Sequence, residues 1–119
     1  MTENEIKTLA RGKYAMQRKE VLENHAPEMY ERMQADGTLE EHLADVQERV
    51  SNYVELNVER YKQRAEYKEV QAVNPFEAAR LLNMTVLEAE NAAYRSWIAS
   101  VPENDEDEED YEDEGDDDE

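Results

Sequence analysis

The stretch that decides the fold is TLEEHLADVQERVSNYVELNVERYKQRAEYKEV, which runs from Thr38 to Val70. Apolar or core-type residues recur along it at spacings of three and four, the period of an amphipathic helix. They are Leu39, Leu43, Val46, Val50, Tyr53, Asn57 and Tyr61. Neither Gly nor Pro interrupts the pattern before Pro75, so it predicts one helix to about residue 70, about 48 Å long. Thr38 and Glu41 stand at the spacing of a capping box at its start.

The residues before this stretch predict two further helices. Ile6, Leu9 and Tyr14 belong to an apolar pattern that favours a helix over about residues 3–23, with Gly12 as its weak point. Pro27 suits the first position of a short second helix. The pair Asp36-Gly37 is typical of a helix end, because glycine readily adopts the left-handed cap conformation.

The residues after it predict a last helix, in which Asn74 is the cap and Pro75 the first residue. One face is expected to be buried. Its members are Phe76, Ala79, Leu82, Val86, Ala89, Ala93, Trp97 and Ile98. A second capping box at Thr85 leaves two interpretations open, a continuous helix or a helix-turn-helix. Glu88 and Glu90 would repel phosphate at the start of a recognition helix, so direct nucleic-acid binding is not expected.

These patterns predict an all-α protein, a three- to four-helix bundle with one long central helix and an acidic C-terminal tail. Residues 1–102 form the expected bundle, and residues 103–119 the tail. The tail holds 14 of the chain's 32 acidic residues and none of its 13 basic ones. Such a segment repels itself and has little apolar surface to bury, so the sequence predicts that it is disordered.

Several function classes find no support in the sequence. The chain has no cysteine, which fits a reducing compartment and excludes thiolate chemistry. It has no apolar run of membrane-spanning length and no signal-peptide pattern, so a cytoplasmic protein is expected. His25 and His42 are the two histidines, and His42 is expected at a solvated helix position rather than in a metal site. No cofactor, metal site or enzymatic activity is predicted.

An acidic face is the first candidate binding surface. Carboxylates recur opposite the apolar seam of the long helix at intervals of one or two turns, and such a face can imitate a nucleic-acid backbone. The partner-binding candidates are Glu41, Asp45, Glu48, Glu55, Glu59 and Glu66, joined in the tail by Asp105, Asp107, Asp110 and Tyr111. A charged outer face is also what any amphipathic helix shows.

A basic segment with interleaved aromatic residues is the second candidate. Its cations are Arg60, Lys62, Arg64 and Lys68. They would bind either the chain's own acidic tail or a nucleic acid. A solvated helix end is the simpler interpretation.

Part of the chain resembles a known family. The residues concerned are Tyr14, Leu22, Pro27, Tyr30, Met33, Gly37, Thr38, Leu39, Leu43, Val46 and Val50. Over about residues 14–54 they resemble the transposon-encoded V proteins, or TnpV-like proteins, of Gram-positive mobile elements. The long acidic tail departs from that family's pattern. The resemblance implies a setting in a phage, plasmid or transposon and does not imply an activity.

The sequence therefore predicts a mobile-element accessory protein that binds a basic protein surface. Its expected action is to inhibit a host nucleic-acid-binding or defence enzyme by acidic mimicry, as an anti-CRISPR-like protein would. One alternative is a DNA-binding accessory of transposition, using Arg60, Arg64, Lys68 and the Arg80 region, with an autoinhibitory tail. Another is a structural oligomer in which Asn57 sets the register. The target, a homodimeric state and ordering of the tail on binding stay open.

Overall fold

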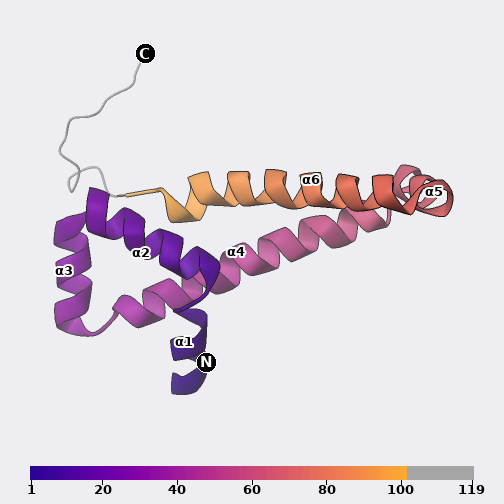
Figure 1. Ribbon diagram of the computed structural model, residues 1–119. Helices are drawn as coiled ribbons and strands as arrows, with labels where there is room; N and C mark the ends of the chain where they lie inside the picture. The colour runs from indigo at the N-terminus through magenta and orange to yellow at the C-terminus, as the bar shows by residue number, and fades with distance from the viewer. Residues whose placement is uncertain (102–119) are drawn as a thin grey trace, which may run out of the picture.

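The computed structural model describes residues 1–101, which are helical without strands, as predicted (Figure 1). The predicted tail lies outside the described residues. In chain order the elements are α1 (Glu3–Leu9), α2 (Lys13–His25), α3 (Pro27–Asp36), α4 (Leu39–Lys62), α5 (Ala65–Val73), α6 (Pro75–Ala93) and the π-helical turn η1 (Tyr94–Ile98). Within residues 1–101 no helix is both long and apolar enough to cross a membrane.

The predicted helix over residues 3–23 is wrong, because the chain breaks at Gly12 into α1 and α2. The side chain of Gln47, from α4, enters the break. Its Oε1 accepts hydrogen bonds from the backbone N–H groups of Tyr14 (2.8 Å) and Ala15 (3.0 Å). These donors at the start of α2 have no partner within the helix. A Cβ on Gly12 would lie 2.3 Å from Gln47 Cδ, so glycine makes room for this cap.

The junction between α3 and α4 lies where the sequence predicts it, but the predicted helix cap is not formed. Gly37 has φ 79°, the left-handed conformation expected after the end of a helix. The capping box at Thr38 is wrong. The Thr38 hydroxyl instead donates to Asp36 Oδ1 at 2.7 Å, and no side chain caps the start of α4. Thr38 has φ −99° and ψ 0°, a helical conformation rather than the extended one that a capping residue usually adopts.

The long central helix is shorter than predicted. α4 ends at Lys62 and measures about 36 Å at 1.5 Å per residue. Arg64 is extended (φ −73°, ψ 140°), and α5 begins at Ala65 in a new direction. The break lets α5 pack against α6 and buries Tyr67. Burying the Tyr67 ring stabilises the protein more than extending α4 would, because a longer α4 would have no other helix to pack against.

The last helix begins as predicted, with Asn74 Oδ1 accepting from the backbone N–H of Glu77 at 3.2 Å. α6 is continuous through Asn83-Met84-Thr85, so the helix-turn-helix interpretation is wrong. The Thr85 hydroxyl donates to the carbonyl of Leu81 at 3.0 Å, a bond made inside a helix rather than at its start.

The expected buried face of α6 is right only in its second half. Ala89, Ala93 and Ile98 are buried, and Val86 and Trp97 pack against them. Phe76 was expected to be buried and is exposed, which is a correction. It lies at the α5 end, where α4 has finished and no element covers that side of α6.

Two long antiparallel helices, α4 and α6, form the spine of the structure (Figure 1). Helix α2 packs on the half of this pair that contains the C-terminus of α6. One core cluster lies where these three meet. Its buried members are Val21, Val46, Val50, Val54, Ala89, Ala93 and Ile98. Tyr53 meets Trp97 edge-on, with ring centroids 5.3 Å apart. A second cluster, around Leu22 and Leu43, joins α2 to α3 and the start of α4.

Candidate functional site

Arg18 is the most unusual charged residue of the fold, because its side chain is buried, with 4% of its surface exposed. Its Nε donates to Nε2 of His42 at 3.0 Å, and one Nη donates to the carbonyls of Ile98 (2.9 Å) and Ser100. Burial lowers the pKa of the guanidinium, which remains charged because arginine is not deprotonated in proteins. A cation here also faces the negative end of the α6–η1 helix dipole.

His42 is not at a solvated position, which corrects the sequence prediction. It is half-buried and accepts the Arg18 hydrogen bond through Nε2, so the neutral ring carries its proton on Nδ1. Burial and the Arg18 charge lower its pKa, opposed by the carboxylate of Asp45. Among residues 1–101 no cluster of three or more His, Asp or Glu side chains could hold a metal ion.

The Arg18 contacts determine where the chain leaves the fold. His42, on the second turn of α4, and Ser100 share one guanidinium, and Val101 packs against both core clusters. The exit therefore lies beside the start of α4, at the end of the molecule where α2 meets α3 (Figure 1). The predicted acidic residues Glu41 and Asp45 belong to this same end, because they flank His42 on α4.

The remaining predicted acids do not form one continuous face. Glu48 is exposed and lines a shallow hollow of about 440 Å³ between α4 and α1. Glu55 is exposed further along α4, and Glu59 pairs with Lys62 at 3.6 Å. Glu66 was expected on the same helix; it lies on α5 and pairs with Arg64 at 3.5 Å. The break at Arg64 therefore removes Glu66 from the predicted stripe.

The basic segment surrounds the corner between α4 and α5. Arg60 and Lys62 end α4, Arg64 lies in the connection and Lys68 is on α5. The Arg64 guanidinium lies 5.7 Å from the ring centroid of Tyr61, which is within cation–π range. The 19 residues of α6, about 28 Å long, separate this corner from the exit at Val101. The structure thus does not bring the basic segment to the start of its own tail.

A second polar contact, also missed from the sequence, joins α2 to α6. The Tyr14 hydroxyl donates to Glu90 Oε2 at 2.6 Å, and Lys13 Nζ lies 3.0 Å from the same oxygen. Burial, together with Glu90, raises the pKa of Tyr14 to about 12, and the Tyr14 hydrogen bond lowers that of Glu90. Glu90 is therefore part of the fold and not a free acid on the surface.

No signal in one sequence distinguishes Arg18 or Gln47 from the many exposed polar residues of amphipathic helices. Gly12 was the only indication, because a glycine inside an apolar helical pattern often marks a break or a close approach. Glu90, similarly, stands among exposed acids in the sequence. The tertiary partners of all three lie at least 24 residues away along the chain, beyond what local periodicity can indicate.

The comparisons with known proteins agree with the sequence resemblance and extend it. Neither the curated proteins nor the solved structures include a match to this chain. The sequence model of the family described as transposon-encoded protein TnpV matches residues 1–98. This covers α1 through η1, including Arg18, His42 and Glu90. The chain therefore belongs to the family of the transposon-encoded protein TnpV.

Proposed function

We propose that this transposon-encoded protein is a non-catalytic inhibitor that binds a basic surface of a nucleic-acid-binding protein. Its binding region combines the acidic segment after Val101 with Glu41 and Asp45 at the start of α4. We name these parts together the acidic end. By occupying a groove that normally holds phosphates, the acidic end competes with nucleic acid for the partner. The expected partner is a host nucleic-acid-binding or defence enzyme.

The observation that carries this proposal is the Arg18 anchor. Hydrogen bonds from one buried guanidinium to His42 and to the carbonyls of Ile98 and Ser100 fix the exit of the chain beside α4. The sequence that follows Val101 carries fourteen carboxylates and no cation, and Val101 is at the same end of the molecule as Glu41 and Asp45. Negative charge concentrated at one place attracts a basic groove more strongly than the same charge spread over the surface.

We propose that the acidic residues of α4 do not contribute equally to binding. Glu41 and Asp45 lie at the acidic end. Glu55 and Glu59 lie closer to the basic segment at the corner between α4 and α5, and Glu59 is already paired with Lys62. Only the first pair is expected to contribute to binding, so the second pair provides a matched control.

The test measures displacement of DNA from a basic partner. Candidate partners are DNA-binding proteins captured from a bacterial lysate at low salt, eluted in salt steps and then purified. A labelled duplex bound to the partner is titrated with four proteins: the full chain, the chain ending at Val101, Glu41→Gln/Asp45→Asn and Glu55→Gln/Glu59→Gln. The proposal expects the full chain to displace the duplex and to lose potency as salt rises.

The variants distinguish the proposal from its alternatives. Shortening the chain at Val101 should weaken displacement at least about tenfold, a change of about 1.4 kcal/mol in binding free energy. Glu41→Gln/Asp45→Asn should weaken it more than Glu55→Gln/Glu59→Gln does. Equal effects of the two double variants would overturn the assignment of the acidic end. DNA binding by the shortened chain, absent from the full chain, would support a DNA-binding accessory with an autoinhibitory tail instead.

A further inference from the structure

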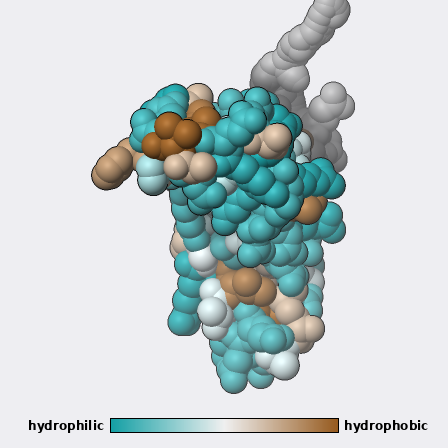
Figure 2. All heavy atoms as spheres, turned by 90° about the vertical axis from the view of Figure 1, so that its right-hand side faces the viewer, coloured by the Kyte–Doolittle hydropathy of each residue, from teal (hydrophilic) through white to brown (hydrophobic). Residues whose placement is uncertain are grey.

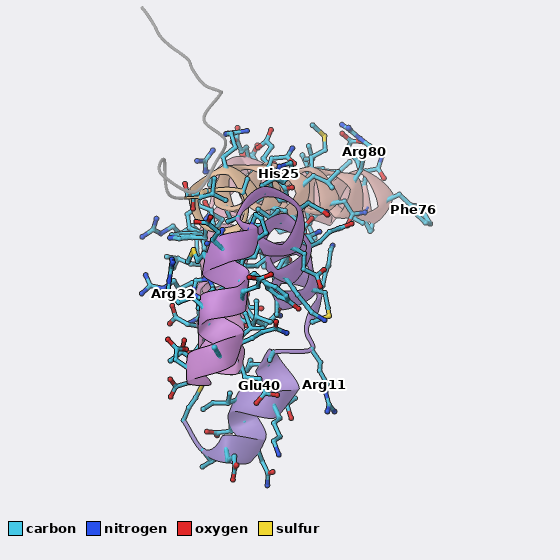
Figure 3. All side chains as sticks on the ribbon, turned by 90° about the vertical axis from the view of Figure 1, so that its left-hand side faces the viewer. Arg11, His25, Arg32, Glu40, Phe76 and Arg80 are labelled. Atoms are coloured by element: carbon cyan, nitrogen blue, oxygen red, sulfur yellow. The ribbon has the colours of Figure 1, made fainter. Side chains whose placement is uncertain are left out.

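The outer face of α6 carries large apolar side chains along its whole length. At 3.6 residues per turn Phe76, Met84 and Leu87 of α6 and Tyr94, the first residue of η1, fall within about 80° of arc, on the side opposite the buried residues Ala78, Ala89 and Ala93. Phe76 is 89% exposed, Leu87 58%, Met84 43% and Tyr94 40%. We name these four residues the α6 face. Figure 3 shows Phe76 pointing away from the rest of the molecule.

The composition of the α6 face is that of an interface core rather than of an ordinary surface. In a chain whose residues are 38% charged, the stripe has one charged member, Arg80. That guanidinium is neutralised locally, because its Nε donates to Glu77 Oε1 at 2.9 Å and an Nη contacts the Met84 sulfur at 3.0 Å. Aromatic residues, Met and Arg are enriched in interface cores, and Lys, Glu and Asp are depleted.

The face extends to the α5 end of the molecule. Val73, the last residue of α5, is 85% exposed and lies three residues from Phe76. Figure 2, which looks onto this end, shows hydrophobic atoms among hydrophilic ones. With about 200 Å² for a large side chain, the exposed parts of Val73 and the α6 face amount to roughly 600 Å². A monomer's largest apolar patch is about 300–600 Å², and two such surfaces together reach the roughly 1,200 Å² at which stable interfaces begin.

The order of residues on the face is close to a palindrome. Phe76 and Tyr94 are equally distant from Thr85, Met84 and Leu87 flank it, and Arg80 before it matches Asn91 after it. Two copies of α6 packed antiparallel would place Phe76 against Tyr94, Met84 against Leu87 and Arg80 against Asn91. A twofold interface requires this kind of self-complementarity, because each surface meets its own copy.

Charge favours the same arrangement. Antiparallel packing places the two exits at Val101 at opposite ends of the pair, separated by more than the Debye length of about 8 Å. Each exit then lies on the side of the partner's α4–α5 corner, which carries Arg60, Lys62, Arg64 and Lys68. Across the pair, Val101 of each copy therefore lies nearer to the basic residues of the other copy than to those of its own chain.

We propose that the α6 face is the contact of a twofold, antiparallel homodimer of this protein. The occupant is therefore a second copy of the chain, and the α4–α6 pairs of the two copies together form a four-helix layer. This proposal does not rest on the proposed inhibition, because no residue of the α6 face is among those proposed to bind the basic partner.

The first experiment measures mass by sedimentation equilibrium over a wide concentration range. The dimer is expected for the full chain, and Met84→Glu should weaken association at least about 100-fold, or about 2.8 kcal/mol. Met16→Glu is the matched control, because Met16 on α2 is 41% exposed against 43% for Met84. Circular dichroism checks that both variants stay folded. A monomer at every concentration, or equal effects of the two variants, would overturn the proposal.

The second experiment tests the antiparallel register, using the absence of cysteine from the chain. Phe76→Cys and Tyr94→Cys are made as single variants and oxidised separately and as a mixture. The register predicts a disulfide-linked dimer in the mixture between the two variants and little in either variant alone. Efficient cross-linking of Phe76→Cys to itself would show parallel packing and contradict the register.

Discussion

At the residue scale, the fold depends on a few polar side chains that lie where apolar ones would be expected. Arg18 satisfies two carbonyls and an imidazole, Gln47 satisfies two amides, and Tyr14 donates to Glu90. Each of these hydrogen bonds adds little net stability, because in the unfolded chain the same groups bond to water. Each is costly to remove, because its partners remain buried without an alternative.

Replacing Arg18 by Met should destabilise the protein while keeping the length and apolar part of the side chain. The carbonyl of Ile98 and Nε2 of His42 would lose their donor, and each buried unsatisfied group costs about 1–3 kcal/mol. We expect the free energy of unfolding in urea to fall by about 2–4 kcal/mol. Arg32→Met on the exposed side of α3 is the control and should change it by less than about 0.5 kcal/mol. An unchanged value for Arg18→Met would refute the anchor.

His42 should make stability depend on pH below neutrality. Its folded pKa lies below the ordinary 6.5, so between these two values the unfolded state binds more protons than the folded state. The free energy of unfolding therefore falls as pH decreases through this window. His42→Gln should flatten the dependence between pH 7 and 5, and the exposed His25→Gln should leave it unchanged. The lowered pKa of Glu90 acts in the same direction only below its ordinary 4.5, so the two windows are separate.

At the element scale, the ends of the helices are set by two different kinds of information. Some ends are local, as where Gly37 and Asn74 provide the cap from neighbouring residues. Others depend on a distant element. The start of α2 is capped by Gln47 from α4. The break after α4 accompanies the packing of α5 against α6 and the burial of Tyr67, whose ring centroid lies 5.5 Å from that of Tyr61.

Gly12→Ala should therefore act through Gln47. The added Cβ would lie 2.3 Å from Gln47 Cδ and displace the cap of α2, a loss of about 1–2 kcal/mol. Gln47→Ala should cost a similar amount, and the double variant about as much as either alone, because both remove the same interaction. Gly37→Ala strains a left-handed position with open space around it and should add to Gln47→Ala independently. Additivity between Gly12→Ala and Gln47→Ala would contradict the shared mechanism.

The same division explains how much could be predicted from the sequence. The all-helical class, the start of the helix at Pro27, its end at Gly37 and the cap at Asn74 followed from local residue types. The break at Arg64 could not, because no Gly or Pro marks it and its cause is tertiary. The burial of His42 was missed for the same reason: its partner Arg18 lies 24 residues away. The acidic candidates were identified from the sequence as one stripe on a single helix. The structure shows that Glu66 lies on α5, whereas Glu41, Asp45, Glu48, Glu55 and Glu59 lie on α4.

At the scale of the whole molecule, charge and apolar surface are separated. Glu41 and Asp45 are on the first turns of α4, at the end of the molecule where the described chain stops at Val101. The basic residues at the α4–α5 corner lie at the opposite end of α6 (Figure 1), and the exposed residues of the α6 face are spread along the helix between these two ends. The proposed inhibition and the proposed dimer thus use different surfaces, and a variant in one should leave the other intact.

The division between fold and acidic segment predicts that two shortened chains behave very differently. The sequence predicts that residues 103–119 form a tail separate from the helical bundle. A chain ending at Val101 should keep the helical content and urea midpoint of the full chain. A chain ending at Trp97 loses Ile98, which is 1% exposed, and both carbonyls that accept from Arg18.

Removal of a buried Ile side chain alone costs about 2–5 kcal/mol, and the unsatisfied Arg18 adds to this. Since a domain of this size is stable by only about 5–15 kcal/mol, the chain ending at Trp97 should be largely unfolded by circular dichroism at 37 °C. If the two shortened chains unfold alike, residues 98–101 do not close the fold. The exit beside α4, on which the acidic end depends, would then be wrong as well.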